Sequence, residues 1–339
     1  MRIPFGSLIE RLPGAGALAE RLMGRGYPLD VDDQREYPTG YDGNVFVWDI
    51  DKTYLQTRFS SMEGLARIPV EFAVDKQAIP GMPEVLRGLR RGPGPGFACA
   101  PLYFVSASPA QLRHVVEHKM LRDGVEYDGT TFKDWVGAVV RLTPWRLREQ
   151  VGFKLCALLT GRMRRPRSVE YLFGDDVERD AWAYHLYARL VEGHLSPEEA
   201  VIAMADAGVH AEDRHCVSDL LERMGPAGGR VARAFIHLES GSPPSRFEEL
   251  APRVVPVRGA VQLSLALVEE GVIGLEAARQ AIEAVKAGKS AGDVDALARD
   301  AVDRGLVSSA NLERVRDGNG KGRDERADGP QKRRDSSSS

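Results

Sequence analysis

Residues 45–55 read VFVWDIDKTYL and place two carboxylates at the end of a run that is typical of a buried strand. The apolar residues of this run are β-branched or aromatic, which suits a strand of a parallel sheet covered on both faces. Because side chains alternate along a strand, Asp49 and Asp51 point to the same side, toward one small volume at the strand's carboxyl end. Two like charges at that spacing need a cation, a shared proton or open water.

The composition predicts a globular protein with no general affinity for nucleic acid. The chain has 339 residues, of which 43% are hydrophobic, enough for one large core and a smaller second one. The net charge of -3 and the pI near 6.2 leave no overall positive field to hold a polyanion. Three cysteines without paired spacing argue against a disulfide framework and favour a reducing compartment. Without a signal peptide or an apolar run long enough to cross a membrane, we expect a cytoplasmic protein.

Strand and helix patterns alternate along most of the chain. Apolar runs at 45–50, 101–109 and 171–173 each end in small or acidic residues and lead into a helical pattern, and 231–239 is a candidate fourth strand. This alternation predicts an α/β fold with an open parallel sheet, whose ligands bind at the carboxyl ends of the strands.

The flanking segments have simpler patterns. Near residues 190, 267 and 301, a helix end is followed by a glycine stop and a new helix start, which predicts three helix-turn-helix corners. The expected organisation is a helical extension over 1–40, a main domain over 41–275, a helical C-terminal extension over 276–316 and a disordered tail over 317–339.

Four short segments together resemble the motifs of the haloacid dehalogenase-like (HAD) superfamily of phosphohydrolases, in order and in spacing. They are DIDKT at 49–53, Ser106 at the end of YFVSASP, Lys154 in GFKLCALL, and YLFGDDVERD at 171–180. More narrowly, FVSASPAQL, IPGM and GDDVERD are similar to the catalytic domain of actin-patch-type phosphatidate phosphatases. The resemblance covers about 41–275 and implies a Rossmannoid open parallel sheet with helices on both faces.

The resemblance implies hydrolysis of a phosphate ester through an aspartyl phosphate. Asp49 matches the nucleophile, and Asp51 matches the general acid and base. Ser106 and Lys154 match the groups that stabilise charge on the transferring phosphoryl group. Thr53 would support the loop and the nucleophile.

The resemblance also implies a Mg²⁺ site. Mg²⁺ prefers oxygen ligands, which fits a cluster of aspartates without His or Cys. The implied ligands are a carboxylate oxygen of Asp49, the main-chain carbonyl of Asp51, and Asp175. Asp180 matches a later acidic position that would hold a metal-bound water or Lys154. The role of Asp176 stays open.

Lys154 lies in the most basic part of the sequence. Lys119 and Lys133 also lie between the second and fourth motifs, but Lys154 begins a helix that leads directly into the strand at 170, as the superfamily pattern requires. The surrounding stretch 141–167 has a strong excess of basic residues. Most should lie on solvated helix faces, yet the stretch could attract an anionic substrate or an anionic membrane surface.

Phosphatidate or another lipid phosphate is the leading substrate, and two other functions stay open. One is a phosphatase or phosphotransferase for a soluble nucleotide or sugar phosphate, and the other is an inactive scaffold that binds partners through its C-terminal helices. His114 and His118 have a spacing that can hold zinc, but with no further soft ligand nearby we expect two ordinary helical histidines.

Overall fold

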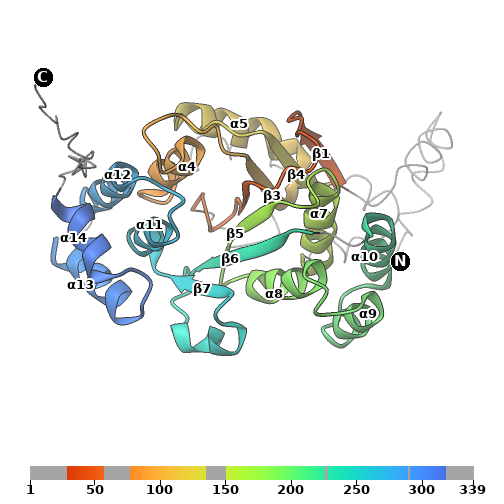
Figure 1. Cartoon of the computed structure of the whole chain (residues 1–339). Helices are drawn as coiled ribbons and strands as arrows, with labels where there is room; N and C mark the ends of the chain where they lie inside the picture. Colours follow the sequence, from red (N-terminus) through yellow and green to blue (C-terminus); the bar gives the residue numbers. More distant parts are fainter. Residues whose placement is uncertain (1–28, 57–76, 135–149, 226–227, 289–290, 318–339) are drawn as a thin grey trace, which may run out of the picture.

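One mostly parallel sheet forms the centre of the protein (Figure 1). The computed structural model describes residues 29–56, 77–134, 150–225, 228–288 and 291–317. Within these residues, seven strands form the sheet in the order β1-β4-β3-β2-β5-β6-β7, and only the β1–β4 pair is antiparallel. The strands are β1 (Leu29–Asp33), β2 (Asn44–Asp49), β3 (Leu102–Pro109), β4 (Gly129–Lys133), β5 (Val169–Asp175), β6 (Arg230–His237) and β7 (Val254–Val257).

Helices cover both faces of this sheet (Figure 1). The first face carries α4 (Met82–Arg91), α5 (Arg113–Arg122), α11 (Gly259–Glu269), α12 (Leu275–Lys286), α13 (Ala291–Asp303) and α14 (Ser309–Asp317). The second carries α7 (Val151–Met163), α8 (Asp180–Val191), α9 (Pro197–Asp206) and α10 (Ala211–Met224). Two 3₁₀ segments are η2 (Ala110–Leu112) and η4 (Pro244–Leu250). No helix in the described ranges has the length and apolar character needed to cross a bilayer.

Alternation along β2 assigns its side chains to the two layers. Val47 packs with the α7 and α8 layer, whereas Trp48 packs with the α4 and α11 layer. On the Trp48 side, aromatic rings of three neighbouring strands stack: Trp48 on Phe173 at 4.2 Å between centroids, and Phe173 on Phe235 at 5.5 Å. Asp49 follows Val47 by two residues, so its position in the strand directs it toward the α7 side.

Several features predicted from the sequence are confirmed. The fold is α/β with helices on both faces, and the candidate strand at 231–239 is β6. The helix that begins near Lys154 is α7, and it leads directly into β5. The three predicted corners are the α8–α9, α11–α12 and α13–α14 connections.

Three strands were not predicted. Residues 29–33 lie within the helical extension expected over 1–40, and that expectation is wrong for them because they form β1. This acidic strand, LDVDD, gains its hydrogen-bond partners from β4. β4 and β7 also have no periodic signal of their own, since they are short and β7 contains Pro256. Residues 1–28 and 318–339 lie outside the described residues, so the predictions for them stay predictions.

The C-terminal helices pack directly on the main domain. Ala278 and Ala281 of α12 are fully buried in the same hydrophobic cluster as α4 and β2. Gly81, the residue that caps α4, has φ +84°, and a Cβ there would lie 2.6 Å from the Cβ of Ala260 and 2.7 Å from the carbonyl oxygen of Ala281. The close contact of α4, α11 and α12 therefore requires glycine at this position.

β7 forms one edge of the sheet. The main-chain carbonyl of Arg253 accepts a hydrogen bond from Ala234 of β6, and that of Val257 accepts one from Leu238, directly after β6. The alternate residue Pro256 therefore faces away from β6. Pro256 has no N–H to offer, and its carbonyl accepts a hydrogen bond from the guanidinium of Arg304. Neither the nitrogen nor the carbonyl oxygen of Pro256 is therefore available to pair with a further strand.

Gly81→Ala should reduce the free energy of unfolding more than Gly305→Ala does. Both glycines have positive φ, but a Cβ at Gly305 would meet nothing within 4 Å. Gly305→Ala should cost about 1–2 kcal/mol from backbone strain, and Gly81→Ala should cost about 1–3 kcal/mol more because of overpacking. Urea unfolding of both variants measures the difference, and equal losses would contradict the close packing of α4 on α11 and α12.

Candidate functional site: a buried acidic cluster with one lysine

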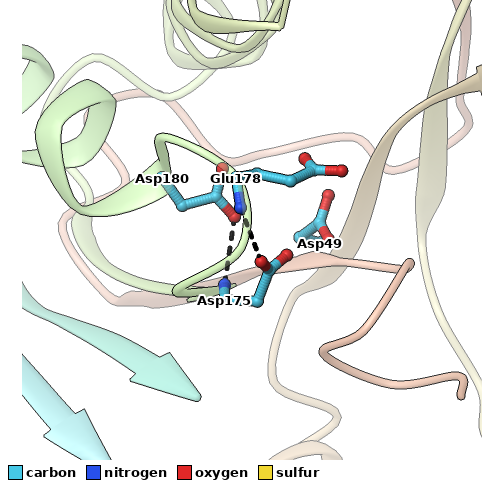
Figure 2. A group of neighbouring side chains, drawn as sticks. All are labelled: Asp49, Asp175, Glu178 and Asp180. Atoms are coloured by element: carbon cyan, nitrogen blue, oxygen red, sulfur yellow. Dashed lines mark hydrogen bonds between the residues drawn. The ribbon is translucent and has the colours of Figure 1, made fainter. Parts of the chain in front are cut away.

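Four carboxylates converge at the carboxyl ends of β2 and β5 (Figure 2). Asp49 is the last residue of β2 and Asp175 is the last residue of β5, while Glu178 and Asp180 lie on the turn into α8 and at its start. One ligand atom from each residue lies within 4.8 Å of those of the others. Because β2 and β5 are parallel neighbours, their ends meet at the same edge of the sheet.

A glycine lets Asp180 approach the strand. A Cβ at Gly174 would lie 2.2 Å from Asp180 Oδ2, so any larger residue would displace this carboxylate. The same oxygen accepts a hydrogen bond of 3.2 Å from the backbone N–H of Asp175 (Figure 2). The carboxylate of Asp180, at the end of the turn between β5 and α8, is therefore hydrogen-bonded to the backbone of Asp175, at its start.

The ammonium of Lys154 lies inside this acidic cluster. Its Nζ is 3.1 Å from Asp49 Oδ1 and 2.8 Å from Glu178 Oε2, and it also donates to Asp180. The side chain is 1% exposed. Thr53 Oγ1 lies 3.5 Å from the other carboxylate oxygen of Asp49, at the limit of a hydrogen bond. One ammonium therefore contacts three of the four carboxylates of the cluster, and the carboxylates outnumber it.

One oxygen of Asp175 has no partner within the described structure. Asp175 Oδ1 accepts hydrogen bonds from the backbone N–H groups of Val177 and Glu178, at 2.7 and 2.8 Å. Its Oδ2 is buried and accepts none. An unpaired buried carboxylate oxygen beside three other carboxylates fits a cation ligand, so these residues could hold a metal ion.

Burial dominates the electrostatics of the cluster. It raises the pKa of Asp49 well above its ordinary value and also raises that of Asp175, although Lys154 opposes both shifts. Burial likewise raises the pKa of Asp180 to about 7. For Lys154, burial lowers the pKa, but Asp180, Asp49 and Glu178 outweigh it and raise the pKa well above its usual range. The lysine stays charged, while the carboxylates favour a proton or a cation.

The carboxylate of Asp51 lies at the end of β3. Asp51 Oδ2 accepts hydrogen bonds from the hydroxyls of Ser106, at 3.0 Å, and Ser108, at 2.6 Å. Ser106 is fully buried, and its oxygen also accepts from the N–H of Ser108 at 3.0 Å. Asp51 is not among the carboxylates that converge on the described metal-ligand cluster. The structure thus places Asp51 and Ser106 together as a second polar group beside the first.

Most of the residues singled out from the sequence gather at this edge of the sheet, and one contributor was missed. Asp49, Asp175, Asp180 and Lys154 are in one cluster, as described above. Glu178 is the missed residue, and Gln150 donates to its Oε1 at 2.9 Å. Its position between two candidate ligands on the same turn was the available signal.

Asp176 has a different role from its neighbours. Its carboxylate accepts hydrogen bonds from Ser240, through both the N–H and the hydroxyl, and from the N–H of Ser242. Burial raises the pKa of Asp176, but these hydrogen bonds outweigh it and lower the pKa below its ordinary value. Asp176 therefore fastens the loop after β6 to the end of β5.

Two arginines in the described part of the basic stretch make structural contacts. Arg164 donates to the main-chain carbonyls of Asp33 and Arg35, and Arg165 is buried with its guanidinium 4.3 Å from the ring centroid of Tyr103. Residues 135–149 of the stretch lie outside the described residues. The side chain of His114 is 88% exposed, and no metal-ligand group that includes it occurs in the described ranges.

Metal-free protein should lose stability as the pH rises from 5 to 8. The pKa of Asp180 is raised from 3.8 to about 7 by burial, so its protonated form is favoured by folding. The resulting stabilisation is fully present below about pH 4 and is lost as the pH rises through about 7. Thermal unfolding with a chelator should show this fall, and Asp180→Asn should flatten it.

Two further measurements separate the cluster from general pH effects. Asp219→Asn, a change at an exposed residue of α10, should leave the pH dependence as in the wild type. Added Mg²⁺ should raise the melting temperature more at pH 8 than at pH 5, because protons compete for the same oxygens. An identical slope in Asp180→Asn and the wild type would contradict the assigned pKa.

Comparisons of the chain with known proteins found no match: no family model matches it, and searches of curated proteins and of solved structures found none.

Proposed function

We propose that this chain is a Mg²⁺-dependent phosphomonoester hydrolase of the haloacid dehalogenase-like type. The observation that carries the proposal is the buried meeting of Asp49, Asp175 and Lys154, with an unpartnered oxygen on Asp175. The polar pair of Asp51 and Ser106 lies directly after the same strand and at the end of its neighbour. These are the residues that the sequence motifs single out, from four separate segments of the chain.

Asp49 and Asp175 are the side chains that would hold the ion. An all-oxygen donor set with excess negative charge suits a hard divalent cation such as Mg²⁺. The resemblance implies that the main-chain carbonyl of Asp51 would be the third ligand that the protein supplies to the ion. When bound, Mg²⁺ would neutralise charge on the phosphate oxygens and so allow a carboxylate to approach phosphorus.

In the proposed reaction, Asp49 attacks the phosphorus of a phosphate monoester. A bond forms between an Asp49 oxygen and phosphorus as the ester P–O bond breaks, and Asp51 donates its proton to the leaving oxygen. Asp51 then accepts a proton from water as that water attacks the aspartyl phosphate. Inorganic phosphate leaves, and Asp49 is regenerated. The hydrogen bonds from Ser106 and Ser108 hold Asp51 beside the nucleophile's strand.

Lys154 supports the proposal through charge. Its ammonium lies 3.1 Å from Asp49, where it would face the equatorial oxygens of a phosphoryl group transferred to that residue. Ser106 would supply a hydroxyl to the same oxygens. Both groups are fixed by secondary structure, Lys154 by the buried helix α7 and Ser106 by β3, so little reorganisation is needed during the reaction.

For the substrate, we propose phosphatidate or another lipid phosphate, following the narrower resemblance of the motifs. A panel of esters that contains phosphatidate, sugar phosphates and nucleoside monophosphates separates this from a phosphatase for soluble substrates. A contact with an anionic membrane surface stays a prediction. Arg164 and Arg165 are not suitable residues to make that contact, because both stabilise the fold.

Asp49→Asn should abolish Mg²⁺-dependent hydrolysis of an aryl phosphate. The amide cannot form the acyl phosphate, and losses of roughly a thousandfold or more in kcat are expected when a nucleophile is removed. Asp219→Asn, which changes an exposed aspartate on α10 in the same way, should retain wild-type turnover. Circular dichroism checks that both variants fold. The proposal fails if purified wild type hydrolyses no ester, or if Asp49→Asn matches it.

A further inference from the structure

A backbone turn under strain follows β2, directly after Asp51. Lys52 has φ +62°, and Lys52 and Cys99 are the non-glycine residues with positive φ in the described ranges. The left-handed region is unfavourable for any residue with a Cβ, so the surrounding structure must hold it. Within the turn, the N–H of Lys52 donates to Leu55 at 2.8 Å, and the N–H groups of Tyr54 and Leu55 donate to Ile50. None of these hydrogen bonds uses the carbonyl of Lys52.

His237 binds that carbonyl from a distant part of the chain. Its Nδ1 lies 2.9 Å from the Lys52 oxygen, and because a carbonyl can only accept, Nδ1 carries the proton and donates. The imidazole is 10% exposed. The carboxylate of Glu239 is 3.8 Å from the same nitrogen, too far for a hydrogen bond. Lys52 is therefore the hydrogen-bond partner of Nδ1.

The backbone of His237 is itself firmly placed. It pairs with Asp175 of β5 on one side and with Val257 of β7 on the other. Its carbonyl accepts hydrogen bonds from the N–H groups of Asp176 and Glu239, both at 3.0 Å. The side chain thus reaches from a rigid strand end, across the end of β5, to the turn after β2.

We infer that His237 is a positioning residue for Asp51, an inference that rests on the proposed function. Lys52 is bonded directly to Asp51, so the orientation of the Asp51 carboxylate toward Ser106 and Ser108 depends on the turn that Lys52 adopts. Without the hydrogen bond from His237, Lys52 relaxes toward an ordinary backbone conformation, and Asp51 turns away from its place beside Asp49. His237 then touches neither substrate nor metal, and acts through the turn alone.

A set of substitutions at His237 tests this with matched geometry. The amide nitrogen of asparagine can take the place of Nδ1, whereas that of glutamine takes the place of Nε2. His237→Asn should keep kcat within about threefold of the wild type, whereas His237→Gln and His237→Leu should lose roughly 10- to 100-fold. KM for an aryl phosphate should stay unchanged, because Asp49 and Asp175 are not moved. The Mg²⁺ concentration at half-maximal rate should rise in His237→Gln and His237→Leu, because the main-chain carbonyl of Asp51, the third proposed ligand, moves with the turn. His118→Leu, on the exposed side of α5, is the control and should retain wild-type kinetics.

A second substitution tests the strain itself. Lys52→Gly makes the left-handed turn favourable without help, so it should restore most of the kcat lost in His237→Leu. Lys52→Gly alone should have little effect, which makes the double mutant strongly non-additive. If Lys52→Gly fails to rescue His237→Leu, the turn is not the link between His237 and catalysis, and the inference is overturned.

The backbone amide of Lys52, observed by NMR in protein labelled with ¹⁵N-lysine, gives a readout that does not need turnover. Its resonance should shift in His237→Leu and His237→Gln but not in His237→Asn. An unchanged resonance in all variants overturns the inference, as does a wild-type kcat in His237→Leu or an equal fall in His237→Asn and His237→Gln. A wild type that hydrolyses no ester is a different failure, since it rejects the proposed function while the Lys52 resonance still reports the turn.

Discussion

The excess of buried negative charge around Lys154 is the constraint on which the rest of the site depends. Four carboxylates meet one ammonium where water is excluded, and burial makes each unpaired charge costly. The site can relieve this by taking up protons, which the raised pKa values of its aspartates favour, or by taking up a cation. The same imbalance makes the four carboxylates a group that could hold a metal ion.

The two hydrophobic layers make this arrangement possible. Trp48, Phe173 and Phe235 stack on one face and fix the relative positions of three parallel strands. On the other face, α7 is buried almost all round and brings Lys154 against the strand ends. Polar groups can therefore be placed to within a hydrogen-bond length by elements that are themselves held by apolar packing.

The sequence predicts those features that depend on the pattern of residues within one short segment. Asp49 and Asp175 could be assigned to one edge because each ends an apolar run, and parallel strands bring such ends together. Glu178 was missed because a carboxylate on a turn has no periodicity, and the role of His237 depends on the pairing of β6 with β5. The buried position of Arg165 was equally hidden, since a run of basic residues resembles a solvated helix face until the packing of its neighbours is known. The strands β1, β4 and β7 owe their conformation to their partners rather than to their own residues.

The edge at β7 has a consequence for behaviour at high concentration. An exposed strand normally offers alternating donors and acceptors to any second chain, and this templating is a common route to aggregation. Here Pro256 removes a donor and Arg304 occupies the neighbouring acceptor, so an incoming strand would find a gap in its ladder. Because Pro256 faces away from β6, it removes no hydrogen bond from the existing sheet, and its missing donor acts only against a strand added beyond β7.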